Sequence, residues 1–151
     1  MTQFIDTVVY VDVDAPTAKD AALGKMAALL APGHGLDADE LHAGFVLREG
    51  ESSTGFGNGV AIPHAKVKGL KQPFVGTVTF NQPVAWDALD GAPVTIAIGL
   101  IMPADDPDQV HLKVLSKLAR KLMDDDFIAE LKGAQHDQDR LNQVLQSVLA
   151  A

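Results

Sequence analysis

The chain has 151 residues, of which 47% are hydrophobic and 21% are charged, and its formal net charge is −8 at pH 7. This composition predicts one globular domain over residues 1–151, and the absence of cysteine excludes disulfides within it. No apolar run approaches the ~20 residues of a membrane span, no basic cluster is typical of a nucleic-acid binder, and residues 1–6 lack the features of a secretory signal. We therefore expect a cytoplasmic protein that binds no nucleic acid and does not insert in a membrane. Its acidic surface suits a basic protein partner, or else only keeps the protein soluble.

In the first half of the chain the pattern predicts a strand followed by two helices. Residues 8–11 form a short β-prone run. Thr17 has the features of an N-cap for a helix whose apolar residues recur up to Leu30, where Pro32 and the following glycine end it. Asp37 begins a second helix, which places Arg48 in its last turn.

The second half predicts two strands and three helices. Residues 74–80 and 94–102 are β-prone, and Asp90-Gly91 between them is a turn signal. Strands that alternate with helices favour an α/β fold, with one sheet covered by helices on both sides. The remaining predicted elements are a loop at 103–108, a helix whose apolar stripe is Leu112, Leu115, Leu118, Ala119 and Leu122, a cap at Asp124, Asp125 and Asp126, and helices at 127–132 and 137–149.

Residues 55–64 are the most informative stretch. A glycine-rich loop leads into a short apolar run, Pro63 halts that run, and His64 follows at once. A neutral imidazole has a lone pair at pH 7 and is an established covalent catalyst. We predict that His64 carries a phosphoryl group, while the alternative is an ordinary histidine at the end of a strand.

Phosphoryl transfer needs hydrogen-bond donors around the phosphoryl oxygens. Glycines allow the backbone to approach an anion closely, and hydroxyl groups and a guanidinium add donors. Arg48 supplies the guanidinium, and the candidate phosphoryl-binding residues are Ser53, Thr54, Gly55, Gly57, Asn58 and Gly59.

His111 is the second candidate catalytic histidine. It lies at the start of a predicted helix, on the stripe of Leu115 and Leu118, so it is expected to point inward. The positive end of the helix dipole favours anions there, and a second imidazole facing His64 could donate to a phosphoryl oxygen. The alternative is a core histidine.

Other functional motifs are absent or weak. The glycines of residues 55–59 precede an apolar run rather than a helix, which excludes the dinucleotide fingerprint, and neither a phosphate-binding Gly-Lys-Ser/Thr loop nor a serine-hydrolase elbow occurs. No metal site or cofactor is expected. We expect surface positions for His34, His42 and His136, and a solvated acidic loop for Asp105, Asp106 and Asp108.

Two blocks of residues resemble the type-2 enzyme IIA domains of the bacterial phosphoenolpyruvate-dependent sugar phosphotransferase system. The resemblance covers nearly the whole chain in order and spacing. The first block is Arg48-Glu49 with residues 53–66, and the second is residues 86–91, Pro93-Val94, residues 102–104 and the helix from His111 to Leu118.

The resemblance implies a mixed sheet between helices. It also implies that His64 accepts a phosphoryl group from phospho-HPr, on Nε2, and passes it to a cysteine of a IIB component, with His111 and Arg48 beside it and without a metal. Because this chain has no cysteine, the acceptor would lie on another chain.

Two sets of residues resemble different branches of the family. Ala65-Lys66 resembles the fructose branch, whereas Asn58 and residues 103–105 resemble the nitrogen-regulatory branch. We favour a sugar-transporting component, with a regulatory protein as the alternative. A descendant without activity is disfavoured because all three catalytic candidates are present. The sugar, the oligomeric state and the order of the strands do not follow from the sequence.

Overall fold

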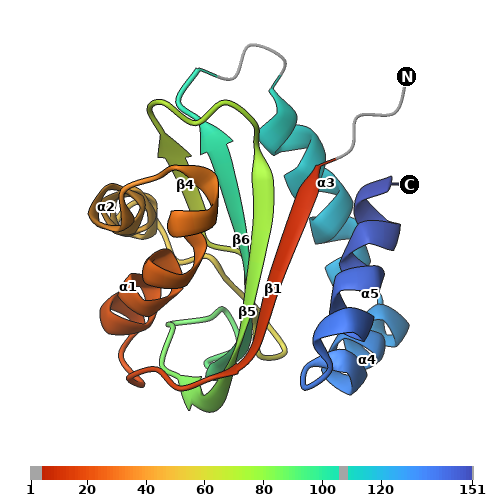
Figure 1. Ribbon diagram of the computed structural model, residues 1–151. Helices are drawn as coiled ribbons and strands as arrows, with labels where there is room; N and C mark the ends of the chain where they lie inside the picture. Colours follow the sequence, from red (N-terminus) through yellow and green to blue (C-terminus); the bar gives the residue numbers. More distant parts are fainter. Residues whose placement is uncertain (1–4, 106–108, 151) are drawn as a thin grey trace.

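A mixed β-sheet of six strands lies between two layers of helices (Figure 1). The structure is a computed structural model that describes residues 5–105 and 109–150. The strand order is β1-β5-β6-β3-β2, and β4 also pairs with β6. β5 runs antiparallel to β6 and β2 runs antiparallel to β3, whereas β1 runs parallel to β5, and β3 and β4 run parallel to β6, which confirms a mixed sheet. The strands are β1 (Asp6–Val13), β2 (Gly55–Gly57), β3 (Val60–Ala61), β4 (His64–Val67), β5 (Phe74–Val84) and β6 (Val94–Pro103).

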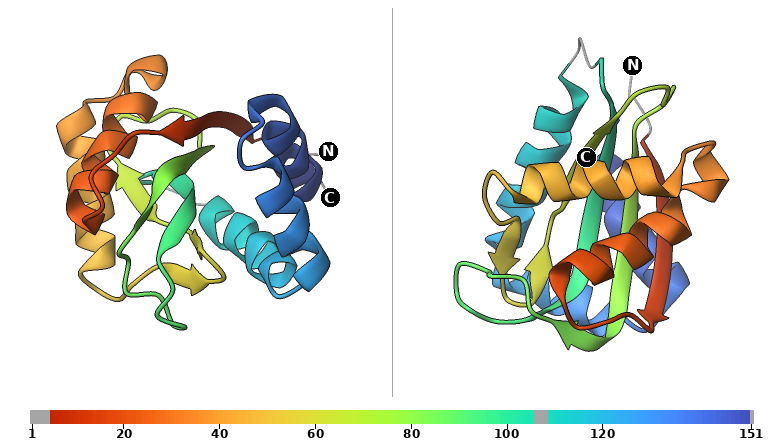
Figure 2. Two further views of the ribbon diagram at one scale, coloured as in Figure 1. Left: turned by 90° about the horizontal axis from the view of Figure 1, so that it is seen from below. Right: turned by 90° about the vertical axis from the view of Figure 1, so that its left-hand side faces the viewer.

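Helices cover both faces of this sheet, as the alternation of strands and helices predicted (Figure 2). One face is covered by α1 (Lys19–Leu30) and α2 (Ala38–Glu49), which are joined through the 3-10 turn η1 (Pro32–His34). The other face is covered by α3 (Val110–Leu122), α4 (Asp125–Ala134) and α5 (Gln138–Ala150).

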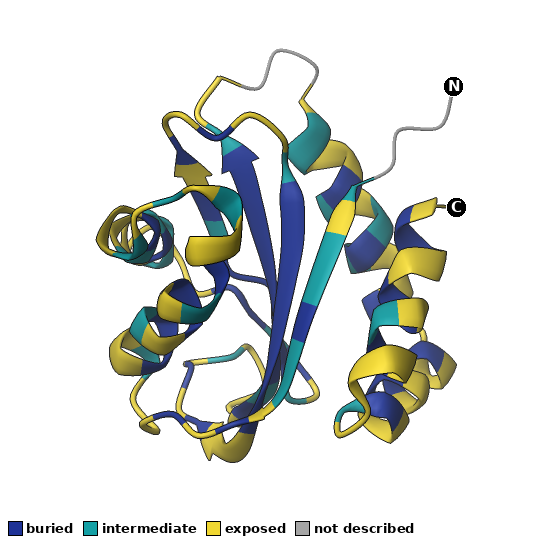
Figure 3. Ribbon diagram, in the orientation of Figure 1, coloured by how far each residue is buried: buried dark blue, intermediate teal, exposed yellow. Residues whose placement is uncertain are grey.

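The central strands are buried on both faces (Figure 3). Side chains alternate across a strand, so Ala97 and Ile101 of β6 pack toward α1 and α2. Ile96, Ile98 and Leu100 pack toward α3, α4 and α5. The apolar residues of β6 therefore join two separate clusters of core side chains.

Two of the three predicted helix caps occur in the structure. The carboxylate of Asp37 accepts hydrogen bonds from two amides of the first turn of α2, and Asp124 accepts one from the first turn of α4. The cap predicted at Thr17 is wrong. Ala18 forms a parallel β-bridge with Ala85, and the Thr17 carbonyl accepts the Ala85 amide, so the extended backbone delays α1 to Lys19.

The glycine-rich segment is ordered rather than an open loop. β2 and β3 form an antiparallel hairpin whose turn is Asn58-Gly59. Both turn residues have a positive φ, 58° for Asn58 and 81° for Gly59, which is the backbone that a tight hairpin turn requires. His64 is the first residue of β4, so it lies at the start of a strand rather than after one.

The burial of two histidines and one leucine differs from what the sequence predicted. His34 and His42 are half-buried, His34 being stacked on Phe74 and His42 bonded to Asp20. Leu112 was expected on the apolar stripe of its helix but is 48% exposed, because Val114 occupies the buried position instead. His136 is exposed as expected. The predicted loop at 103–108 and its acidic cluster lie partly outside the described residues.

Candidate active site

Strand β4 positions His64 through the alternation of its side chains. Ala65 and Val67 are buried toward α1 and α2, so His64 and Lys66 lie on the opposite face of the strand. His64 pairs with Leu100 of β6, and the carbonyl of the preceding proline accepts the Leu100 amide at 2.8 Å. The imidazole is thus attached to a backbone that the sheet holds in place.

The environment of the ring keeps His64 neutral at pH 7. Both ring nitrogens are shielded from solvent, and neither makes a well-formed hydrogen bond within the described residues. Burial lowers the pKa of His64 from 6.5 to about 4, with the Arg48 guanidinium as the second cause. The Ile62 carbonyl and the Glu49 carboxylate oppose this lowering of the pKa, and His111 contributes slightly to it.

His64 lines a surface hollow of about 320 Å³, which we call the His64 pocket. The imidazole is therefore not sealed inside the core, although its nitrogens are covered. The pocket combines a guanidinium, an ammonium, a carboxylate and two imidazoles with apolar walls. Its residues include His64, Lys66, Leu100 and Met102 from the sheet, Leu47 and Arg48 from α2, Glu51 after α2, and His111 from α3.

Arg48 reaches the pocket from the last turn of α2, as the sequence predicted. Its Nη1 donates to the carbonyl oxygen of Ser52 at 2.9 Å and lies 3.4 Å from the Ser52 hydroxyl. These contacts hold the planar head against the loop that follows α2. The remaining donors of the fork are suited to an anion above His64.

His111 lies in the first turn of α3 and lines the same pocket. Its location at a helix N-terminus adds the positive end of the dipole to the pocket. The sequence therefore identified three side chains, His64, Arg48 and His111, that β4, α2 and α3 bring together.

A buried carboxylate fixes the backbone beside Arg48. The Glu49 side chain is 7% exposed, and its Oε1 accepts a hydrogen bond from Lys19 Nζ at 3.3 Å. It also accepts the Thr54 amide at 3.1 Å and the Thr54 hydroxyl, and the Trp86 indole donates to that hydroxyl at 3.3 Å. This network, which we call the Glu49 network, ties the end of α2 to α1 and to the chain after β5.

None of the six predicted phosphoryl-binding residues lines the His64 pocket. The Ser53 hydroxyl donates to the Trp86 carbonyl, and the Asn58 amide donates to Asp90. A Cβ at Gly55 would lie 2.7 Å from the Ala88 backbone, so this glycine is required by close packing. A phosphoryl-binding role for Ser53, Thr54, Gly55, Gly57, Asn58 and Gly59 stays a prediction.

The structure adds residues to which the sequence analysis gave no role in the site. Lys66 follows His64 by two positions, the spacing that puts two side chains on one face of a strand. Leu47 is 75% exposed beside Arg48. The strand period could have revealed Lys66, but Glu51 and Leu47 required knowledge of how α2 packs on β4.

The described residues form neither a metal-binding cluster nor a helix that could span a membrane. Within residues 5–105 and 109–150, no group of three His, Asp or Glu side chains is arranged to hold a metal ion. No helix in those same ranges has the length and apolar content to span a bilayer. What the pocket can do chemically is attract an anion, through Arg48, Lys66 and the start of α3, to a wall formed in part by the neutral His64 ring.

Comparisons with known proteins identify the family of the chain. A family model for the phosphoenolpyruvate-dependent sugar phosphotransferase system, EIIA 2, matches residues 4–148. The chain is 37% identical over 122 residues to a nitrogen regulatory protein of Klebsiella oxytoca, covering 80% of this chain and 75% of that one. It is 43% identical over 105 residues to a fructose-like EIIA component of Escherichia coli K12, covering 68% and 70%.

Solved structures show the same fold. The nitrogen regulatory protein IIA-Ntr of Neisseria meningitidis is 28% identical, with a TM-score of 0.74 over 92% of this chain and 91% of that one. Enzyme IIAMTL, solved in complex with phosphorylated enzyme IIBMTL from Escherichia coli, is 19% identical, with a TM-score of 0.70 over 92% and 94%. The second likeness concerns the fold alone.

Proposed function

The chain belongs to the EIIA 2 family of the phosphoenolpyruvate-dependent sugar phosphotransferase system, and on this basis we propose that it is a phosphocarrier that uses His64 as the acceptor. The donor is phospho-HPr, the final acceptor is a cysteine of a IIB component, and the exchange takes place in the cytoplasm. The observation that carries this proposal is the convergence of His64, Arg48 and His111 on one pocket in which the His64 ring is neutral.

The transfer consists of two displacements at phosphorus. In the first, the lone pair of His64 Nε2 forms a bond to phosphorus while the bond between phosphorus and the donor breaks, and its electron pair returns to the donor. In the second, a thiolate of the IIB component attacks the phosphorus, and the electron pair of the N–P bond returns to Nε2. A neutral ring is required for the first step, which is what the low pKa of His64 provides.

Arg48 and His111 act on the charge of the transferred group. That charge spreads over three equatorial oxygens in the transition state. The Arg48 fork donates to one or two of these oxygens, and the His111 imidazole donates to another. The partly buried walls of the pocket strengthen each of these contacts relative to water.

A regulatory protein is the second candidate function. The Klebsiella and Neisseria proteins are both nitrogen regulatory proteins, whereas the Escherichia coli relative is a fructose-like EIIA component. The fructose branch that the sequence favoured therefore has no advantage over the regulatory branch. Both branches use the same phosphohistidine and differ in what reads or receives the phosphoryl group.

The test is phosphorylation of the chain by phosphoenolpyruvate, enzyme I and HPr. We expect one acid-labile, base-stable phosphoryl group on His64, absent from His64→Gln and retained in the matched control His136→Gln, whose imidazole is exposed. Retention of the label in folded His64→Gln would refute the proposal. Adding a fructose-type IIB component to the labelled chain then separates the branches, because a carrier loses its label to the IIB cysteine within seconds and a regulator keeps it.

A further inference from the structure

The far edge of the sheet presents a backbone that pairs with no other strand among the described residues. β1 is the first strand in the sheet order and pairs only with β5. Every second residue of such a strand directs its N–H and C=O groups away from the sheet. The register between β1 and β5 shifts after Tyr10, and Asp12 has a φ of 54°, so the regular edge is limited to the first part of β1.

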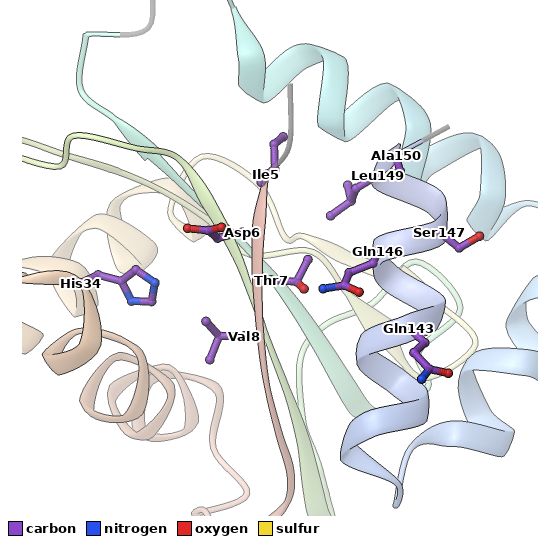
Figure 4. A pocket seen from close by; sticks show the side chains of 10 residues that line it. All are labelled: Ile5, Asp6, Thr7, Val8, His34, Gln143, Gln146, Ser147, Leu149 and Ala150. Atoms are coloured by element: carbon purple, nitrogen blue, oxygen red, sulfur yellow. The ribbon is translucent and has the colours of Figure 1, made fainter. Parts of the chain in front are cut away.

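A groove follows this regular part of the edge. Two surface hollows, of about 660 and 250 Å³, share Thr7 and Val8 and together extend along the chain from Ile5 to Tyr10. In Figure 4, His34 lies on one side of β1 while Gln143 and Gln146 of α5 lie on the other. We call this depression the β1 groove. At about 3.3 Å per residue, it matches an extended segment of about six residues.

The chemistry of the groove favours a peptide that carries positive charge. Its charged side chains are the carboxylates of Asp6 and Asp139, and its polar groups are mostly side-chain amides of α5. Neither hollow is lined by a lysine or an arginine among the described residues. A strand that adds to the edge would satisfy the outward backbone groups of β1, while its basic side chains would meet the carboxylates.

We propose that the β1 groove binds an extended basic segment of a protein partner, which adds to the sheet as a strand beside β1. A second copy of this chain is a poorer occupant, because each copy has a net charge of −8 and brings its own Asp6 to the junction. The groove lies at the opposite end of the strand order from β2, β3 and β4. A segment bound there leaves the His64 pocket open, so this inference stands independently of phosphoryl transfer.

The probe is an N-acetylated hexapeptide in which lysine and valine alternate, compared with the same peptide carrying glutamate in place of lysine. Each is titrated into the ¹⁵N-labelled full chain and followed by amide NMR spectra. We expect the lysine peptide to shift the amides of residues 5–10 and the side-chain amides of Gln143 and Gln146. Intermolecular contacts between backbone protons of the peptide and β1 are expected as well.

Charge variants test the proposed complementarity. Asp6→Asn and Gln146→Lys change exposed positions of the groove, and each is expected to weaken the lysine peptide about threefold or more at low salt. Gln82→Lys adds the same charge to an exposed position late in β5 and is the matched control. Equal effects of the two lysine variants would overturn the proposal.

Other outcomes would assign the groove differently. Any one of three results would refute a basic peptide site at β1: amide shifts confined to the His64 pocket, equal binding of the two peptides, or no amide shift at millimolar peptide. A dimer in sedimentation that dissociates on Gln146→Lys would assign the edge to a second copy instead. Contacts in the free chain between residues 1–4 and residues 5–10 across the groove would assign it to the chain's own start.

Discussion

At the scale of single residues, the reactivity of His64 depends on what surrounds its two nitrogens. Burial and the adjacent Arg48 both disfavour the charged imidazolium, so the ring is neutral well below pH 7. A histidine in water at pH 6.5 would be half protonated. The same ring in this pocket has its lone pair available throughout the physiological range.

This predicts an unusual titration of His64. In ¹H–¹³C NMR spectra of the His64 ring, we expect a midpoint near the pKa of about 4 rather than near 6.5. A His64 midpoint at or above 6 would contradict the effect of burial and Arg48.

The same shift in pKa makes the stability of the fold depend on pH. Because the folded pKa is lowered, the unfolded chain binds a proton between pH 6.5 and about 4 that the folded chain does not. The stabilisation is therefore fully present above pH 6.5 and is lost as the pH falls, by up to about 3 kcal/mol at 1.36 kcal/mol per unit of pKa. In urea unfolding, His64→Gln is expected to lose less stability than the wild type over this range.

At the scale of elements, the end of α2 and the segment that follows it form one unit. The Glu49 network joins this segment to α1 and to Trp86, and Arg48 holds the same segment through Ser52. The Thr54 hydroxyl is central, because it donates to Glu49 and accepts from the Trp86 indole. Loss of that hydroxyl leaves the Glu49 carboxylate and the Trp86 indole N–H without this partner.

We predict that Thr54→Val lowers the free energy of unfolding by about 1–3 kcal/mol, the cost of such unsatisfied groups. Thr77→Val is the matched control: Thr77 is fully buried in β5, and its hydroxyl has no partner among the described residues. Removing that hydroxyl is expected to be neutral or stabilising, because valine suits a buried strand. Urea denaturation of both variants measures the difference, and equal losses would show that the Glu49 network contributes nothing.

At the scale of the whole molecule, two glycines set the distance between α1 and the sheet. Gly76 and Gly99 face each other across β5 and β6. A Cβ at Gly76 would lie 2.6 Å from the side chain of Leu30, and one at Gly99 would lie 2.6 Å from Met26 and 2.8 Å from the Gly76 carbonyl oxygen. The close contact of α1 with the sheet therefore depends on the missing side chains.

We predict that Gly99→Ala destabilises the fold by about 1–3 kcal/mol, since the core must shift to admit the methyl group. Gly133→Ala, within α4, is the control: its Cβ would meet only Arg140 at 3.9 Å. There the gain in helix propensity is expected to stabilise the protein by about 0.5–1 kcal/mol. Thermal unfolding of both variants provides the measurement, and a neutral Gly99→Ala would show that α1 moves without cost.

The sequence alone determined the long elements and three side chains of the candidate site. The helical period of α2 and α3 and the apolar run of β6 extend over several turns or residues, so local pattern was sufficient to predict them. The residue types at His64, Arg48 and His111 indicated phosphoryl chemistry because a neutral imidazole is a nucleophile, and a guanidinium and a second imidazole are donors to phosphoryl oxygens. The start of α1 was misplaced because a β-bridge to Ala85, far along the chain, competes with the cap at Thr17.

Only the tertiary structure decided what surrounds these residues. The strands of residues 55–67 are short. Of these, β3 and β4 pair with β6, far along the chain, and β2 pairs with β3, so no local pattern displays the partners of β3 and β4. Packing of α2 on β4 brings Arg48 and Leu47 to the His64 pocket, whereas the glycine-rich hairpin contacts the segment after β5, through Asp90 and Ala88. The low pKa of His64 likewise arises from burial and from charges on other elements, which are properties of the folded chain and not of neighbouring residues in the sequence.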